Sequence, residues 1–195
     1  MTDWKKQKIF TNNRSTLKKI SRDDSNKEKI EYMTESERAA VDFDAVKRDY
    51  ANSLNLSEKT ADSVDGMFEA NGGLVFVEFK NGNMKNEKAK VKSKIRDSLL
   101  IFCDIIGVEI ENTRKMVEFI LVYNIDKNPM PNQLKNQQIQ ESQSRLNIAQ
   151  YLCQRAGKEF IRFDLERFQT LYFKEVHTYS KEEFEKYLLN LKWNH

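Results

Sequence analysis

Asp65, Glu78 and Lys80 are the side chains of this sequence whose types and spacing could do chemistry together. They stand in two short segments rich in apolar residues, 63–69 and 74–80. Two carboxylates suit Mg²⁺, which prefers oxygen ligands and keeps several waters. A bound divalent ion lowers the pKa of its water and neutralises charge that develops on a phosphate, and a nearby ammonium can orient or deprotonate that water. The trio would therefore suit the hydrolysis of a phosphodiester.

These three groups meet only if neighbouring strands carry them. The sequence predicts two strands over residues 63–69 and 74–80, joined by a tight turn at Asn71-Gly72-Gly73. Residues two apart in a strand share a face, so Glu78 and Lys80 point the same way. Pairing around the turn brings them close to the level of Asp65.

A purely structural interpretation of Glu78 and Lys80 stays open. The two residues could form a charge pair on a wet face of the sheet. Against this, apolar residues flank both carboxylates, and the neighbouring predicted helices offer apolar faces to cover the sheet. Charges on a covered sheet cost free energy unless they serve one another or a metal.

Further elements are predicted on both sides of this hairpin. A capping box at Thr34 and Glu37 indicates a first helix that continues to about Ser53. The last helix has a second box, at Ser180 and Glu183. Between them the patterns predict a long helix from about Lys88 that stops at Gly107, a buried strand over 116–123, a helix over 138–156, a strand over 160–163 and a short helix through Phe168 and Leu171.

The chain is predicted to form one α/β domain. Residues 1–33 are polar, basic and weakly periodic, which favours a flexible N-terminal arm or a loosely attached helix. Residues 34–195 follow without an internal repeat or a linker rich in Pro, Gly or Ser. We divide this domain into a core over about 34–124 and a C-terminal extension over about 125–195.

Asp65 followed by Glu78-Phe79-Lys80 on an apolar strand resembles the PD-(D/E)XK motif of restriction-endonuclease-like nucleases. The order of helix, hairpin, long helix and buried strand is similar to the αβββαβ core of that superfamily, and the resemblance covers about residues 34–124. It implies that Asp65 and Glu78 bind Mg²⁺ or Mn²⁺ with the backbone carbonyl of Phe79, while Lys80 acts at the attacking water. The string Glu78-Phe79-Lys80-Asn81-Gly82, followed by Asp97-Ser98-Leu99-Leu100, also resembles a group of bacterial and phage-associated proteins.

The sequence departs from the superfamily pattern at two points. Val64 stands where the motif has proline, and no clear first strand is seen between the first helix and Ser63. Some families of this kind add an acid from the first helix. Three acids are available for that role, and the sequence leaves the choice among them open: Glu37, Asp42 and Asp44.

A basic run that begins inside the proposed site indicates a nucleic-acid partner. The residues expected to contact phosphates are Lys85, Lys88, Lys92 and Arg96. Lysine-rich helix faces are also common as simple solvated surface, so this alternative stays open. A homodimer that cuts both strands is compatible with the sequence, although no exposed apolar stripe demands one.

Composition excludes several other classes of protein. No apolar run approaches the roughly 20 residues of a membrane-spanning helix, and the N-terminus has no apolar signal-peptide core. Two isolated cysteines and two histidines give none of the usual zinc patterns, and neither His177 nor His195 has a partner at ligand spacing. We therefore expect a cytoplasmic Mg²⁺-dependent endonuclease that acts on DNA rather than RNA, in bacterial or phage restriction, repair or defence. The alternative is a protein of the same fold without activity that serves as an interaction, immunity-type or nucleic-acid-binding module.

Overall fold

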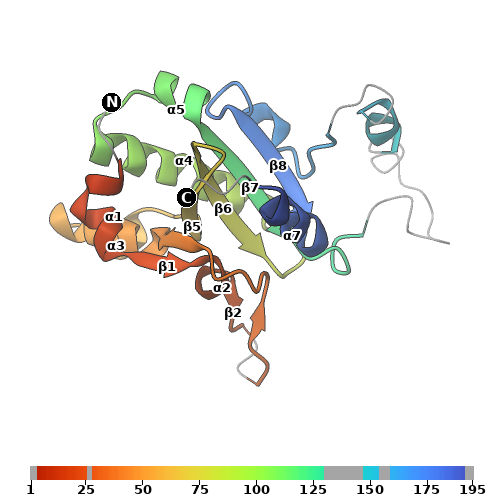
Figure 1. Ribbon diagram of the computed structural model, residues 1–195, viewed down its shortest axis with the longest axis horizontal. Coiled ribbons are helices and arrows are strands. Elements are labelled where there is room, and N and C mark those ends of the chain that lie inside the picture. Colours follow the sequence, from red (N-terminus) through yellow and green to blue (C-terminus); the bar gives the residue numbers. More distant parts are fainter. Residues whose placement is uncertain (1–3, 26–27, 130–146, 154–158, 192–195) are drawn as a thin grey trace.

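A six-stranded mixed sheet organises the computed structural model, which describes residues 4–25, 28–129, 147–153 and 159–191 (Figure 1). The strand order is β1-β4-β5-β6-β7-β8; the first four strands pair antiparallel, and β6, β7 and β8 run parallel. A separate hairpin consists of β2 (Arg22–Asp23) and β3 (Glu31–Tyr32). The predicted α/β class is confirmed at this level. The strands of the sheet are β1 (Arg14–Thr16), β4 (Ala39–Asp42), β5 (Gly66–Ala70), β6 (Gly73–Lys80), β7 (Val117–Tyr123) and β8 (Glu175–Ser180).

Helices cover both faces of the sheet. On one face α4 packs Val91, Ile95 and Phe102 against Phe76 of β6 and Phe119 of β7. On the other face, nearer the viewer in Figure 1, α7 covers β6 and β7 with Phe184 and Leu188. The α-helices are α1 (Lys8–Asn12), α2 (Leu17–Ile20), α3 (Phe43–Ser53), α4 (Lys88–Ile106), α5 (Ile110–Met116) and α7 (Lys181–Asn190); residues 147–153 are also helical, and short 3₁₀ turns are η1 (Trp4–Lys6), η2 (Glu58–Thr60) and η4 (Glu166–Phe168).

The predicted β5–β6 hairpin is confirmed. Asn71 and Gly72 connect the strands with φ of 50° and 76°. Two consecutive residues with positive φ give the turn whose twist matches paired strands, and Asn-Gly is the sequence that adopts it most easily. The hairpin is therefore fixed by local sequence.

The predicted long helix, its stop and the buried strand after it are also confirmed. Helix α4 ends at Gly107, which has φ of 65° in the left-handed region that glycine adopts at low cost. The return through α5 lets β7 run parallel to β6, and all seven residues of β7 are buried. The second capping box is likewise present at Ser180 and Glu183, at the start of α7.

The predicted first helix from Thr34 is wrong in its first half. Residues 39–42 form β4, between β1 and β5, and the helix begins only at Phe43. Asp42 is the true cap, because its carboxylate accepts a hydrogen bond from the Ala45 N–H at 2.9 Å. Thr34 instead hydrogen-bonds to Glu185 of α7. The sequence showed no clear strand between the first helix and Ser63; in the structure a strand, β4, comes before the helix α3 instead.

The prediction of a flexible arm over residues 1–33 is wrong for the described residues 4–25 and 28–33. Strand β1 is the edge strand beside β4, and the side chains of Phe10 and Leu17 are 1% and 0% exposed. Apolar residues are sparse in this segment, so its periodicity is weak. The few that it has are nevertheless buried, and burial of that kind fixes a short segment on a larger core.

The C-terminal extension differs from its predicted elements. Residues 160–163 are not a strand, since Phe163 and Asp164 turn with φ of 63° and 60°. The strand lies further on, as β8, where buried and partly exposed residues alternate. Near Phe168 the predicted helix is only the short turn η4. Of the predicted helix 138–156, residues 138–146 and 154–156 lie outside the described residues. Among the helices that are described, none is long and apolar enough to cross a membrane.

Gly66 is a position where we expect a large effect of a single methyl group. A Cβ there would lie 2.7 Å from the Val41 carbonyl oxygen and would also collide with the side chain of Ile20. Ile20 can rotate, but the paired backbone of β4 cannot yield, so Gly66→Ala should destabilise the fold by about 1–3 kcal/mol. Gly82→Ala is the matched control, because a Cβ at Gly82 meets nothing within 4 Å. Chemical denaturation of both variants checks this, and equal midpoints would contradict the close approach.

Candidate active site

Asp65 is held where the chain enters the sheet, directly before β5. The preceding N–H, of Val64, donates to Ser98 Oγ of α4 at 2.8 Å. The β5–β6 ladder ends one residue after Asp65, which leaves the N–H of Phe79 without a strand partner on that side. Asp65 Oδ2 accepts that N–H at 2.7 Å. The carboxylate is thus fixed beside β6 by a backbone donor.

Glu78 of β6 lies beside Asp65, because both carboxylates contact the ammonium of Lys94. Its side chain is 0% exposed. Burial raises the pKa of the Glu78 carboxyl to about 8; the negative charge of Asp65 adds to this, and the positive charges of Lys94 and Lys80 oppose it. The pKa of Asp65 is also raised, chiefly by burial, although Lys94 and the Phe79 N–H lower it. A nearby cation therefore stabilises the ionised form of both carboxyl groups, which burial disfavours.

Lys94 of α4 supplies such a charge, and the sequence analysis did not select it. Its ammonium lies 2.8 and 3.0 Å from the two oxygens of Glu78 and 3.1 Å from Asp65 Oδ1. Burial lowers the pKa of Lys94, but the charges of Asp65 and Glu78 outweigh that effect, so the pKa is raised. Lys94 therefore stays protonated between the two acids.

One signal in the sequence could have identified Lys94. Val91, Lys94, Ile95 and Ser98 recur at spacings of three and four, which places them on one stripe of α4. Val91 and Ile95 are buried in the core. A lysine and a serine on an apolar stripe need polar partners in the core, and here those partners are the two acids and the backbone before β5.

Lys80 lies at the end of β6, between Glu78 and the surface. Its ammonium is 3.3 Å from Glu78 Oε1 and 3.3 Å from Glu87 Oε2, and its side chain is 17% exposed. The structure thus brings together the three predicted catalytic residues, Asp65, Glu78 and Lys80. Asp65 and Lys80 reach solvent through a cleft, whereas Glu78 is buried behind them.

This cleft has a volume of about 470 Å³ and is lined by Asp65, Phe79 and Lys80, with residues 20–23 opposite them. Asp44 of α3 also lines it, accepts a hydrogen bond from Ser63 Oγ and raises the pKa of Asp65 by its charge. Of the three candidate acids, Asp44 is therefore the one at the site. Asp42 caps α3, and Glu37 lines a separate, larger cavity of about 870 Å³ beside α7.

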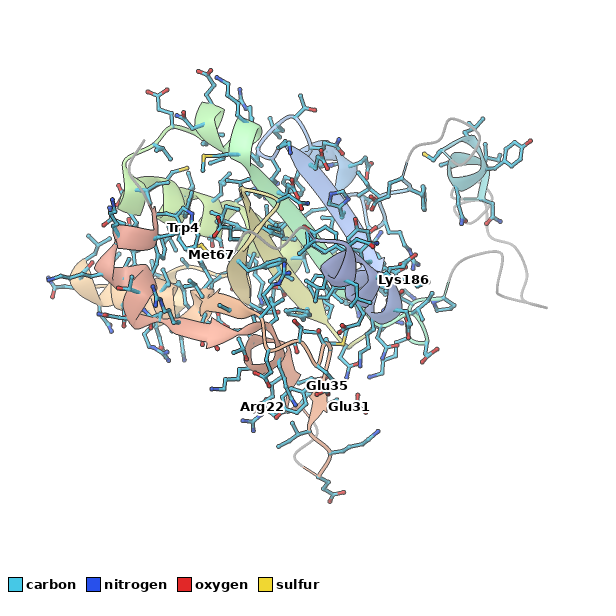
Figure 2. The ribbon with its side chains drawn as sticks, in the orientation of Figure 1. Trp4, Arg22, Glu31, Glu35, Met67 and Lys186 are labelled. Atoms are coloured by element: carbon cyan, nitrogen blue, oxygen red, sulfur yellow. The ribbon has the colours of Figure 1, made fainter. Side chains whose placement is uncertain are left out.

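Polar residues of the N-terminal segment close the other side of the cleft. Asn81 follows Lys80 and donates hydrogen bonds to Asp23 Oδ2 and Glu31 Oε2, both at 2.8 Å. Figure 2 shows Glu31 and Arg22 together on the β2–β3 hairpin, and Arg22 and Asp23 line the cleft. The segment expected to be a flexible arm thus forms one wall of the candidate site.

None of the four predicted phosphate-binding residues lines this cleft. The ammonium groups of Lys88 and Lys92 are 3.2 and 3.8 Å from Asp164 Oδ2. Arg96 lies over the ring of Phe168 at 5.7 Å. Lys85 is exposed and, with Lys88, lines a cavity of about 550 Å³ that shares Asn83 and Lys127 with the cleft.

The donor atoms at the cleft fit a hard divalent cation. Asp65 and Glu78 offer carboxylate oxygens, which Mg²⁺ prefers. In a strand the N–H and C=O of one residue point to the same side, so the Phe79 carbonyl is directed toward the side of Asp65 as its N–H is. The Lys94 ammonium already stands where both acids attract positive charge. A metal held here would share or replace that contact.

In comparisons with known proteins, no protein-family model, curated protein or solved structure matches the chain.

Proposed function

We propose that this protein is a Mg²⁺- or Mn²⁺-dependent endonuclease that hydrolyses phosphodiester bonds of DNA. The observation that carries the proposal is the convergence of Asp65, Glu78 and two lysines beside a cleft that Asp65 and Lys80 line. Lys94 lies within 3.1 Å of both acids, and Lys80 lies 3.3 Å from Glu78. Asp65 and Lys80 have no evident need to line a polar cleft if the only role of the cluster is structural.

The arrangement of elements supports a relation to the PD-(D/E)XK superfamily. When the connecting helices α3 and α5 are set aside, β4, β5, β6, α4 and β7 follow one another in the βββαβ order, with Asp65 before the second strand and Glu78 on the third. A departure is that α3 connects β4 to β5. This insertion is what brings Asp44 to the cleft.

Each residue has a distinct part in the proposed reaction. Asp65, Glu78 and the Phe79 carbonyl would hold the metal, which supplies an activated water and charge neutralisation when bound. Lys94 is protonated and keeps the two acids at their spacing, so we assign it as a positioning residue. Lys80 lines the cleft and orients the attacking water there or stabilises the negative charge of the transition state.

A path for the phosphate backbone leads away from the cleft. Asn83 and Lys127 connect it to the neighbouring cavity, where Lys85 and Lys88 lie. Ammonium groups at these positions would neutralise successive phosphates, which makes binding depend on salt. Restriction, repair or defence in bacteria or phage is the setting that we propose for this activity.

One observation favours the second candidate, an inactive module on the same fold. The Glu78 side chain is 0% exposed, and its oxygens are already bonded to Lys94. A buried, mutually satisfied ion cluster can serve the fold alone. Such a protein would bind nucleic acid or a protein partner without cleavage.

Replacement of Lys80 by alanine separates the two candidates. For the enzyme, we expect Lys80→Ala to lower kcat about 100- to 1,000-fold, the loss typical of a group that stabilises a transition state. Its effect on stability should be smaller, because Lys94 remains to balance Glu78. The measurement is cleavage of linear, circular and single-stranded DNA, and of RNA, with Mg²⁺ or Mn²⁺.

Lys115→Ala is the matched control, since Lys115 pairs only with Glu111 of α5 among the contacts described for it and lies outside the cleft. Cleavage by wild type and control, but not by Lys80→Ala, supports the enzyme. Equal cleavage by all three proteins would show that Lys80 takes no part in the reaction. Binding of nucleic acid without cleavage by any of them would support the inactive module.

A further inference from the structure

A second group of potential metal ligands lies on the other face of the sheet. Glu118 of β7 is directly paired with Glu175 of β8, and His177 follows two residues after Glu175 on the same face. Their ligand atoms all lie within 4.8 Å of one another. Glu78 faces the α4 side, with Phe76 and Leu121, whereas this group faces the α7 side, with Ile120 and Val122. The two sites are thus separate.

The histidine is oriented as a metal-binding histidine usually is. His177 Nδ1 lies 2.6 Å from Glu159 Oε2, and that carboxylate fixes the ring so that Nε2 points to Glu175. A carboxylate behind the imidazole is the common outer contact of zinc-bound histidine. The ring is further held by stacking on Tyr179, with centroids 5.2 Å apart.

The distances suit a small transition-metal ion. His177 Nε2 lies 3.3 Å from Glu175 Oε2. Two ligands about 2.1 Å from a tetrahedral zinc ion are roughly 3.4 Å apart, so these two atoms already have that spacing. The ligand oxygen of Glu118 lies within 4.8 Å of the other two atoms, so it would need to approach by up to about 1.4 Å to become the third ligand.

Three carboxylates, of Glu118, Glu159 and Glu175, gather at this group. Among the described residues, the ion pairs that these acids form are with Lys174, which is 3.2 Å from Glu118 Oε1 and 49% exposed, and with His177 itself. The buried hydroxyl of Tyr187 has no hydrogen-bond partner among the described residues. Burial raises its pKa, the charges of Glu118 and Glu175 add to this, and the charge of Arg38 opposes it. The hydroxyl could donate to a water on the ion.

We propose that Glu118, Glu175 and His177 bind a Zn²⁺ ion, with Glu159 as the outer partner of His177. Nitrogen and carboxylate donors together select Zn²⁺ over Mg²⁺, which takes oxygen alone. The ion would tie the edge strand β8 to β7. It would also fix the segment that carries Glu159 to both strands. The site is independent of the proposed nuclease chemistry.

Titration of the full chain with Zn²⁺ alone, after treatment with EDTA, tests this site. We expect one equivalent to bind to wild type, and His177→Ala and Glu175→Gln to weaken that binding by more than about 100-fold. Glu159→Gln should weaken it by about tenfold, as loss of an outer partner does. Glu175 is 47% exposed, so its replacement keeps the core intact if His177→Ala fails to fold.

The matched control is His195→Ala, at the other histidine of the sequence. It should retain the affinity of wild type, and Co²⁺ in place of Zn²⁺ should give a visible spectrum that His177→Ala lacks. Zn²⁺ binding that is equal in His177→Ala and wild type would overturn the assignment. So would the absence of a bound equivalent in wild type.

Discussion

A Glu78→Gln variant should cleave at least about 100-fold more slowly than wild type in the presence of metal. Changes to the outer partners of a metal ligand alone cost 10- to 100-fold, so loss of the ligand charge itself costs at least as much. Glutamine keeps the shape of the side chain in a position that is 0% exposed, and Asp65 still balances Lys94. Cleavage rates measured over a range of Mg²⁺ concentrations give the result.

Asp65→Asn should behave in the same way, whereas Glu111→Gln, on the exposed surface of α5, should not differ from wild type. Far-ultraviolet circular dichroism and thermal unfolding show whether each variant folds. A folded Glu78→Gln protein that cleaves at the wild-type rate would show that the buried acid takes no part in the reaction.

The Lys94→Ala variant should be the least stable of the single variants described above. It leaves Asp65 and Glu78 buried without their shared cation, and removal of one partner from a buried ion pair costs about 3–5 kcal/mol. For a chain of this length, that corresponds to a fall in Tm of roughly 10 °C. Thermal unfolding in EDTA at pH 7 measures the difference from wild type.

The loss in Lys94→Ala should depend on pH in a defined direction. The pKa values of Asp65 and Glu78 are raised in the folded protein, for Glu78 to about 8, and they rise further without Lys94. Between the ordinary and the raised pKa the folded state binds more protons, so the free energy of unfolding falls as pH rises. Below the wild-type pKa values both folded proteins bind the same protons, so the loss should be smallest near pH 5. It should widen as pH rises through about 8, where Glu78 ionises in wild type but, with its pKa raised further, stays protonated in the variant.

Addition of Glu78→Gln to Lys94→Ala should restore part of the lost stability. Glutamine removes a carboxyl that must be either buried as a charge or protonated on folding, so the two substitutions should couple favourably when measured as a double-mutant cycle. Additive effects, or a pH-independent loss, would mean that Lys94 stabilises the fold by packing alone.

The part of the fold that follows from local signals could be predicted from the sequence. The Asn71-Gly72 turn, the stop of α4 at Gly107 and the capping box of α7 are each fixed by residues close together in the chain. Strand β4 could not be predicted, because Ala39, Ala40 and Val41 have little pattern of their own. They are extended because β1 and β5 pair with them on both sides.

Strand β8 was missed for a related reason. Its side chains alternate between the α7 face and the opposite core, but Glu175 and His177 look like loop residues until their partners on β7 and Glu159 are known. Of the proposed zinc ligands, Glu175 and His177 lie two residues apart, but the third, Glu118, lies on β7, so the complete set has no short spacing in the sequence. A search for the usual patterns therefore passes over them.

At the candidate active site, alternation along the hairpin was sufficient to bring Asp65, Glu78 and Lys80 together. The contribution of Lys94 depends on how α4 lies across β6, and that of Asp44 depends on the insertion of α3 between β4 and β5. Both are tertiary features. The contribution of residues 20–23 to the cleft could not be predicted, because the N-terminal segment has too little hydrophobic periodicity to indicate that it packs on the sheet.

One time course on supercoiled and linear DNA decides whether the two acids serve a hydrolytic metal site. Wild type with Mg²⁺ should cleave, stop on addition of EDTA and resume when Mg²⁺ is restored in excess, while Asp65→Asn stays inactive throughout. Cleavage that continues in EDTA, or that Asp65→Asn performs equally well, would contradict the proposed mechanism.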